Sequence, residues 1–159
     1  PIAYTPFGEL TVFVFFGLVA VMGTDWVLTG QVGAATALAS LAIGALAAAA
    51  LAVNNHRDIV HDAQVGRRTF AVVFGAAGSR RLFTVLLALP FALLPAIALA
   101  GHSPALLLPL LLAPAAWALR RDFRACPGGL AFNAVLFAAF RLELHFAALL
   151  AAGALIGVR

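Results

Sequence analysis

Residues 34–64 read AATALASLAIGALAAAALAVNNHRDIVHDAQ, an apolar segment that passes directly into a cluster of charged and amide side chains. Residues 34–53 carry no charge and match the roughly 20 apolar residues that an α-helix needs to cross the hydrocarbon core of a bilayer. Alanine dominates this segment, and together with Gly33 and Gly44 it predicts close helix–helix approach in lipid. The stretch therefore predicts a transmembrane helix that ends in a polar site.

The overall composition also indicates a membrane protein. Hydrophobic residues make up 64% of the 159 residues, charged residues only 10%, and the mean hydropathy is +1.07. A soluble domain carries about 25% charged residues. The net charge of +4 comes from arginines scattered among apolar segments, which argues against a nucleic-acid partner. The single Cys126 excludes an internal disulfide, and no cysteine cluster indicates a thiolate metal site.

Other apolar segments extend the same pattern along the chain. The predicted spans are five: 9–28, 34–53, 82–100, 104–119 and 142–157. Prolines inside the third and fourth spans predict kinked helices there, and these are Pro90, Pro95, Pro104, Pro109 and Pro114. The sequence thus predicts an all-α, polytopic transmembrane helical bundle.

The arginines separate the connections between these spans into two kinds. The connections after the second and fourth spans contain Arg57, Arg67, Arg68, Arg80, Arg81, Arg120, Arg121, Arg124 and Arg141. The connections at 29–33 and 101–103 contain no arginine. The positive-inside rule then predicts a multi-pass protein of the cytoplasmic membrane, with the N-terminus and both arginine-rich connections in the cytoplasm and the C-terminus outside.

The polar cluster from Asn54 to Gln64 contains a pair of carboxylates. Asp58 and Asp62 are four residues apart, so a continuous helix places them on one face, with Asn54 one turn earlier on the same stripe. Like charges at this spacing repel unless a cation lies between them. All candidate ligands are carboxylate or amide oxygens, which favours a hard cation such as Mg²⁺.

Basic side chains follow the carboxylates. Gly66 is expected to end the helix, and Arg67 and Arg68 come directly after it, while Arg57 precedes Asp58. A metal-binding acidic face opposite arginine forks is suited to a diphosphate ester, because the metal bridges carboxylates to phosphate oxygens and the arginines neutralise the remaining charge. This pattern predicts stabilisation of a departing diphosphate.

At these residues the chain resembles the UbiA superfamily of intramembrane prenyltransferases, in particular the branch that prenylates 1,4-dihydroxy-2-naphthoate on the way to menaquinone. The branch pattern, approximately NNxRDxxxDxxxGKxTLAVxxG, is matched by Asn54, Asn55, Arg57, Asp58, Asp62, Gly66, Thr69, Ala71, Val72 and Gly75. Residues 3–17, AYTPFGELTVFVFFG, resemble the entry to that branch's fifth helix. Arg67 stands where the branch has lysine, and Phe70 where it has leucine. An acidic residue often found between the two aspartates is absent, which leaves the number of metal ions open.

The resemblance implies a fold larger than this chain. Family members have nine helices and a further aspartate-rich motif in an N-terminal bundle, so residues 1–159 are expected to be the C-terminal part, without that bundle and its motif. The start at Pro1 instead of methionine agrees with this expectation. The isolated chain is accordingly expected to be catalytically inactive, with the missing bundle of the same protein as its partner.

The resemblance also implies an activity: Mg²⁺-dependent transfer of a polyprenyl group from an allylic diphosphate to 1,4-dihydroxy-2-naphthoate, with decarboxylation. The implied catalytic and metal-binding residues are Asp58 and Asp62. The residues implied to support them or hold diphosphate are Asn54, Asn55, Arg57, Arg67 and Arg68. The expected partners are the polyprenyl diphosphate, the aromatic acceptor and the lipid bilayer.

Three alternatives use the same residues differently. A UbiA-type enzyme for another acceptor, such as 4-hydroxybenzoate or a tetrapyrrole, shares the fold. A transporter or channel piece would use its membrane carboxylates for ions, although such carboxylates usually lie near the bilayer midplane. An inactive truncated half is the third. For single residues, Asp58 and Asp62 at a solvated helix end, or Arg67 and Arg68 as ordinary positive-inside residues, are the simpler interpretations.

Overall fold

The computed structural model describes residues 2–157. These residues form helices joined by short connections, with no β-strand among them, and the predicted all-α class is confirmed. Two segments are 3₁₀ helices (η1, η3) and one is a π-helix (η2). The elements in chain order are η1 Ile2–Tyr4, α1 Gly8–Val12, η2 Phe13–Met22, α2 Gly23–Thr29, α3 Ala34–Arg57, α4 Ile59–Gln64, α5 Phe70–Ala100, η3 Pro104–Leu112, α6 Ala113–Ala125 and α7 Ala131–Gly157.

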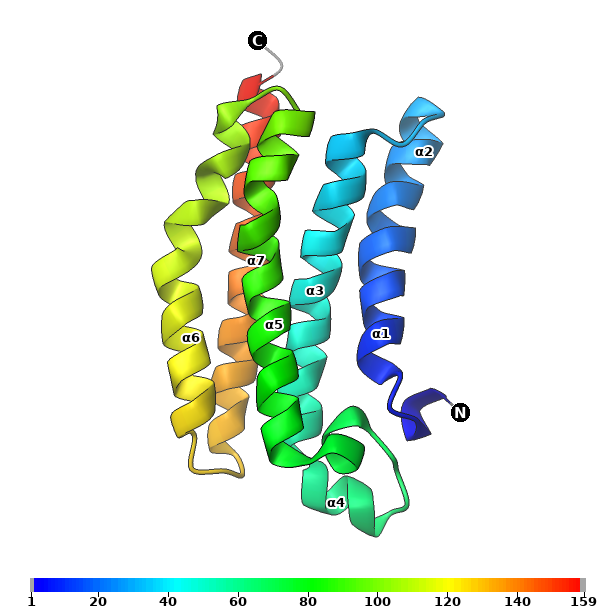
Figure 1. Ribbon diagram of the computed structural model, residues 1–159, viewed down its shortest axis with the longest axis vertical. Coiled ribbons are helices and arrows are strands. Elements are labelled where there is room, and N and C mark those ends of the chain that lie inside the picture. The colour runs from blue at the N-terminus through cyan, green and yellow to red at the C-terminus, as the bar shows by residue number, and fades with distance from the viewer. Residues whose placement is uncertain (1, 158–159) are drawn as a thin grey trace.

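Among the described residues, four helices are long and apolar enough to cross a membrane: Gly8–Thr29, Ala34–Arg57, Phe70–Ala100 and Ala131–Gly157. The span expected at 104–119 is not a single α-helix. It is divided between the 3₁₀ segment η3 and the shorter α6, which run alongside α7 (Figure 1). Proline has no backbone N–H and cannot donate an α-helical hydrogen bond. Pro104 and Pro109 within η3, and Pro114 at the start of α6, account for this division.

Two predicted helix starts were too late. α5 begins at Phe70 instead of residue 82, and α7 begins at Ala131 instead of residue 142. Arg80, Arg81 and Arg141, which were expected in connections, therefore lie inside helices. Their long aliphatic stems allow the charged ends to extend from a helix toward water, so arginine does not end a helix near a membrane surface. The chain interrupts α5 only once, at Gly75, whose φ of 70° and ψ of 177° are not helical.

Helix α3 lies at the centre of the bundle and packs against η2, α5 and α7. Seven of its thirteen buried residues are alanine. A β-carbon on Gly17 of η2 would lie 2.5 Å from the carbonyl oxygen of Ser40, and one on Gly44 would lie 2.6 Å from the carbonyl oxygen of Phe13. Only glycine permits the two backbones to approach so closely. The prediction of close helix approach at Gly44 is confirmed.

The connections are sorted by charge at the two ends of the bundle. α4 and the α6–α7 connection lie at one end, while the α2–α3 and α5–η3 connections lie at the other (Figure 1). The first pair contains or adjoins the arginines, and the second pair, residues 30–33 and 101–103, contains none. The polar motif therefore lies at the basic end of the bundle.

Candidate functional site

The polar motif begins where α3 ends. Arg57 is the last residue of α3, Asp58 has non-helical dihedral angles (φ −94°, ψ 8°), and α4 begins at Ile59. The backbone still forms i to i+4 hydrogen bonds across this point, because Asp58 N donates to Asn54 O at 3.1 Å and Asp62 N donates to Asp58 O at 2.8 Å. The prediction of one continuous helix through the motif is therefore wrong, because the helix is interrupted at Asp58. Backbone hydrogen bonds still link Asn54 to Asp58 and Asp58 to Asp62.

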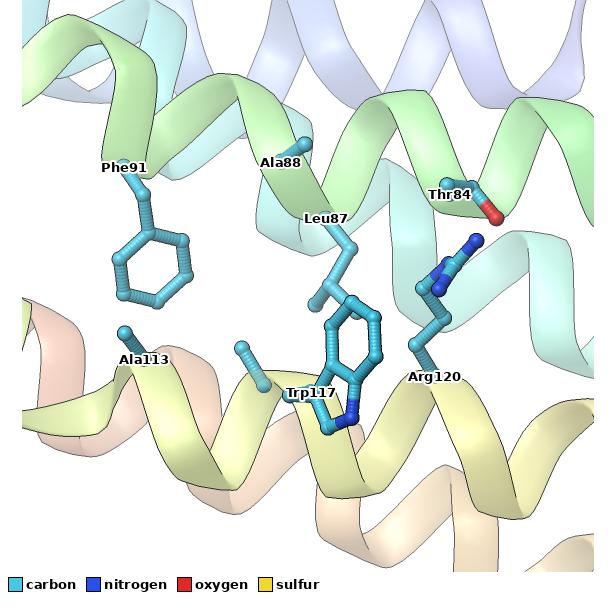
Figure 2. A pocket seen from close by; sticks show the side chains of 8 residues that line it. Thr84, Leu87, Ala88, Phe91, Ala113, Trp117 and Arg120 are labelled. Carbon is cyan, nitrogen blue, oxygen red and sulfur yellow. The ribbon is translucent and has the colours of Figure 1, made fainter.

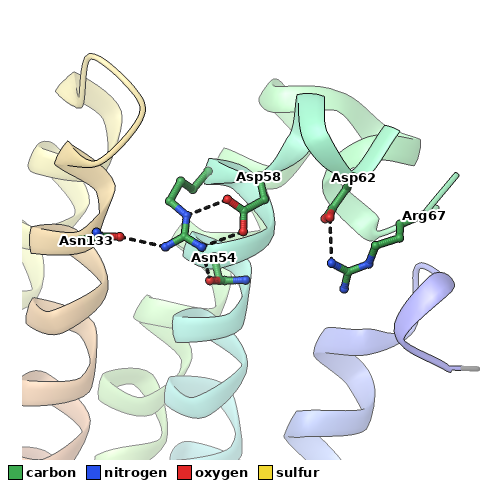
Figure 3. A network of polar contacts seen from close by, with 6 residues as sticks. Asn54, Asp58, Asp62, Arg67 and Asn133 are labelled. Carbon is green, nitrogen blue, oxygen red and sulfur yellow. Dashed lines mark hydrogen bonds and ion pairs between the residues drawn. The ribbon is translucent and has the colours of Figure 1, made fainter. Parts of the chain in front are cut away.

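Arg57 is the centre of a hydrogen-bond network that joins two helices (Figure 3). It donates from Nε and Nη2 to the two oxygens of Asp58, each at 2.7 Å. Nη2 also donates to Asn54 Oδ1 at 2.9 Å, and Nη1 donates to Asn133 Oδ1 of α7 at 2.8 Å. The hydrogen bonds from Arg57 are the main cause that lowers the pKa of Asp58 below its ordinary value. Asp58 therefore stays ionised at neutral pH.

Asp62 has a different environment. Its side chain is 1% exposed, and Oδ1 accepts a hydrogen bond from Arg67 Nη1 at 2.8 Å (Figure 3). Its other oxygen, Oδ2, is buried and has no hydrogen-bond partner among the described residues. A buried carboxylate oxygen without a donor is costly, so this atom is the strongest indication of a missing cation or donor at the site.

The loop after α4 turns Arg67 back toward Asp62. Gly66 has a φ of +76°, a conformation that glycine adopts readily, and Arg67 N then donates to Asp62 O at 2.8 Å. The N-terminal segment supports the same loop. The Tyr4 ring centroid lies 5.8 Å from the Arg67 guanidinium carbon, and Arg68 N donates to Tyr4 O at 3.1 Å. Arg68 itself is exposed.

Asn55 points away from Asn54 and forms a buried pair with Glu9 of α1. Its Nδ2 donates to Glu9 Oε1 at 2.9 Å, and the two residues are 4% and 5% exposed. Oε2 of Glu9 is buried without a hydrogen-bond partner among the described residues. Asn55 thus fixes α1 against α3 and supports the motif from behind.

Two contacts of the site were not predicted, Glu9 with Asn55 and Asn133 with Arg57. Each joins residues far apart in the sequence, so local spacing carried no signal for the pairing. An acid at the start of an apolar span, and a single amide near the start of α7, were the available signals. The His56 side chain is buried and packs against Phe123 and Phe132, with ring centroids 4.8 Å and 5.4 Å away.

An apolar pocket of about 290 Å³ leads away from Asn54. Its walls come from the first span, α3 and α7, and it is lined by Val12, Phe16, Ala47, Ala50, Leu51, Asn54, Leu136, Phe140 and Glu143. Asn54 also accepts a hydrogen bond from Arg57. The pocket and the arginine network therefore share one residue, which suits a ligand with a polar end and an apolar chain.

The residues present fit a Mg²⁺ ion that is bound partly by the protein and partly by the substrate and water. No group of three or more His, Cys, Asp or Glu side chains that could hold a metal occurs within residues 2–157. Magnesium, however, is commonly bound through one or two carboxylates, with water and substrate phosphates as its other ligands. Asp62 Oδ2 has no hydrogen-bond partner among the described residues, whereas each oxygen of Asp58 already accepts one hydrogen bond from Arg57 and has one lone pair left for a metal.

The fold and the polar cluster together describe a multi-pass membrane segment with a charged site at one end of its helices. Residues 2–139 match the UbiA prenyltransferase family. The chain therefore belongs to the UbiA prenyltransferase family. No solved structure matches it significantly.

Relatives with assigned names are similar over part of the chain. A 1,4-dihydroxy-2-naphthoate octaprenyltransferase of Mycobacterium tuberculosis is 46% identical over 88 residues, 55% of this chain and 30% of the relative. The protein of that name from Haemophilus influenzae is 38% identical over 117 residues, 70% of this chain and 38% of the relative. UbiA prenyltransferase domain-containing protein 1 of Gallus gallus is 35% identical over 121 residues, with 76% and 36% covered. The chain spans roughly a third of each relative's length.

Proposed function

We propose that the intact protein transfers a polyprenyl group from an allylic diphosphate to 1,4-dihydroxy-2-naphthoate, with loss of carbon dioxide, in menaquinone biosynthesis. Family membership supports prenyl transfer, and the names of the relatives favour this acceptor. The observation that carries the site assignment is the buried Asp62, whose free oxygen lies on a carboxylate already paired with Arg67. The chain supplies one side of the site, and the rest of the intact protein supplies the other.

Binding of the diphosphate is assigned to the arginines. Arg57 and Arg67 each hold a carboxylate in this structure, and the forked guanidinium of each also suits phosphate oxygens. Asp58 and Asp62 are the proposed Mg²⁺ ligands, and the bound ion neutralises negative charge that develops on the departing diphosphate. Asn54 and Asn55 hold the end of α3 in place, and Arg68 at the exposed rim adds positive charge.

The apolar pocket beside Asn54 is assigned to the prenyl chain. The C–O bond to diphosphate breaks with both electrons leaving on oxygen, the electron-rich ring then forms the new C–C bond to the allylic carbon, and carbon dioxide leaves. A cation at the allylic carbon reacts with any water present. Walls such as Phe16, Ala47 and Phe140 exclude water from the reacting carbon.

The basic end of the bundle is proposed to face the cytoplasm, in the cytoplasmic membrane. All arginines of the described residues lie in or near the connections at that end, which supports this orientation through the positive-inside rule. The diphosphate then meets the site from the aqueous side, while its chain enters the bilayer.

The test is a transfer assay with the full-length protein that contains this chain. It is supplied with a polyprenyl diphosphate, Mg²⁺ and one acceptor at a time: 1,4-dihydroxy-2-naphthoate, 4-hydroxybenzoate or a tetrapyrrole. We expect product only with the naphthoate, and none after exhaustive chelation. Transfer to 4-hydroxybenzoate or a tetrapyrrole in place of the naphthoate would reject the naphthoate as the acceptor. Full activity without divalent metal would reject the magnesium assignment of Asp58 and Asp62.

A further inference from the structure

A second groove lies between α5 and α6, away from the motif. It has a volume of about 350 Å³ and is lined by Thr84, Leu87, Ala88, Phe91, Ala113, Ala116, Trp117 and Arg120 (Figure 2). Figure 2 shows Phe91 and Ala113 at one end of the groove and Thr84 and Arg120 at the other. The groove is therefore apolar along its length and positively charged at one end.

Arg120 differs from the other arginines whose partners are known. Arg57, Arg67 and Arg121 each pair with an aspartate. Arg120 forms no such ion pair within residues 2–157, and its Nε is buried without a hydrogen-bond partner there. Its guanidinium lies over Trp117, with the guanidinium carbon 5.1 Å from the ring centroid. Arg120 as a residue is only partly buried, but its buried Nε lacks an acceptor among the described residues, and such a donor is costly. The guanidinium is therefore suited to an anion supplied from outside the chain.

The nearest polar lining group does not satisfy this donor in the structure. The Thr84 hydroxyl donates to Arg80 O at 2.9 Å. Arg120 lies near the basic end of α6, where Arg121 and Arg124 follow it. The groove thus carries its charge at the depth where lipid headgroups meet helix ends, and its apolar part extends toward the middle of the bundle.

We propose that this groove binds an anionic phospholipid, with the phosphate on Arg120 and one acyl chain along Leu87, Phe91 and Trp117. The charge at one end and the apolar length match one lipid molecule in one orientation. Basic pockets between transmembrane helices are suited to anionic headgroups. No lining residue of this groove belongs to the proposed prenyl-transfer site, so the proposal does not depend on that function.

The test uses the full-length protein in phosphatidylcholine vesicles that contain a small fraction of phosphatidylglycerol brominated on its acyl chains. Bromine quenches tryptophan at short range, and the Trp117 contribution is isolated by subtracting the signal of the Trp117→Phe variant. The reference is the same fraction of brominated phosphatidylcholine. We expect stronger quenching by phosphatidylglycerol, because bulk lipid touching the exposed Trp117 gives equal quenching by both.

Matched variants locate the preference. Arg120→Gln is expected to lower the preference for phosphatidylglycerol about fivefold. Arg121→Gln removes the same charge from the neighbouring position, which is exposed and paired with Asp122, and should leave the preference intact. Ala88→Phe fills the groove and should abolish the preference. Val85→Phe on the same helix is exposed outside the groove and should not change it.

Several outcomes would overturn the proposal. Equal quenching by the two lipids rejects selective binding. Absence of quenching by either lipid shows that another part of the intact protein covers the groove. Equal effects of Arg120→Gln and Arg121→Gln would show that the preference for phosphatidylglycerol comes from general surface charge and not from this groove. Displacement of the quenching by inorganic phosphate or free diphosphate shows an ordinary anion site in place of a lipid site.

Discussion

The two aspartate–arginine pairs of the motif look equivalent in the sequence but differ in the structure. Arg57 binds both oxygens of Asp58 and extends to α7 through Asn133, and the side chains of the pair are 25% and 29% exposed. Asp62 is 1% exposed, one of its oxygens accepts a hydrogen bond from Arg67, and the other has no hydrogen-bond partner among residues 2–157. The first pair is a closed connection between helices, and the second retains an unused acceptor. The availability of a carboxylate thus depends on its partners more than on its spacing.

The largest expected effect comes from removing either carboxylate charge. Asp62→Asn and Asp58→Asn in the full-length protein should each lower kcat by on the order of 10²–10³-fold or more, because each removes a proposed ligand of the Mg²⁺ that would neutralise the departing diphosphate. Turnover of the purified variants is the measurement, with membrane insertion checked for each. Asp122→Asn, which alters an exposed pair at the same end, is the matched control and should remain active. Near-normal turnover of the Asp62 variant would show that the unpaired oxygen of Asp62 is not used in catalysis.

Arg67 allows the second pair to be sharpened. Arg67→Ala should raise the KM for the prenyl diphosphate about tenfold to a hundredfold, since losing a hydrogen bond to a charged group costs about 1.5–3 kcal/mol. Arg67→Lys should retain much of the affinity, because an ammonium keeps the charge that lies beside Asp62. Steady-state kinetics with varied prenyl donor measure both. An unchanged KM in the alanine variant would show that Arg67 does not bind the diphosphate and serves only as the partner of Asp62 or as a topology signal.

Asn133 allows the first pair to be tested across helices. Asn133→Ala removes an acceptor of Arg57, and a double-mutant cycle with Arg57→Gln should give a coupling energy of about 1 kcal/mol in the free energy of unfolding. The same cycle between Asn133→Ala and Asp122→Asn should give none, because within residues 2–157 the Asn133 side chain bonds to Arg57 and not to the exposed Arg121–Asp122 pair. Additive effects of Arg57→Gln and Asn133→Ala would mean that the first pair does not connect α3 to α7.

The sequence was sufficient for the features that depend on local composition. Four of the five spans predicted from apolar length correspond to helices of the described residues that are long and apolar enough to cross a membrane. Small residues predicted the close contact at Gly44, and arginine placement predicted which connections share one end. The starts of α5 and α7 were missed because arginine was taken as the end of a span, although Arg80 and Arg141 continue helices. In the proline-rich span, the prolines lack a backbone N–H, and from this the sequence predicted a kinked helix. It did not predict the 3₁₀ segment that the structure shows there.

The site was predictable as a set of residues but not as an arrangement. The sequence motif identified Asn54, Asp58 and Asp62, and the structure contains the i to i+4 backbone hydrogen bonds expected between them. The separate pairing of each aspartate depends on where α3 stops and on how Gly66 turns the next arginine back. The contacts of Glu9 with Asn55 and of Asn133 with Arg57 depend on which helices become neighbours. The residue pattern within one segment does not determine which helices become neighbours.

The smallest expected effect is a pH dependence confined to the first pair. Hydrogen bonds from Arg57 are the first cause that lowers the pKa of Asp58, burial opposes them, and the charges of Arg57, His61 and Arg67 add to the lowering. A carboxyl with a lowered pKa in the folded state stabilises the fold above its unfolded pKa, and that contribution is lost as the pH falls through the folded pKa. The difference in thermal unfolding between the wild type and Asp58→Asn should therefore be constant from about pH 6 to about pH 8 and shrink below about pH 4. A difference that changed between about pH 6 and about pH 7 would instead follow histidine titration, and it would show that Arg57 does not control the charge of Asp58.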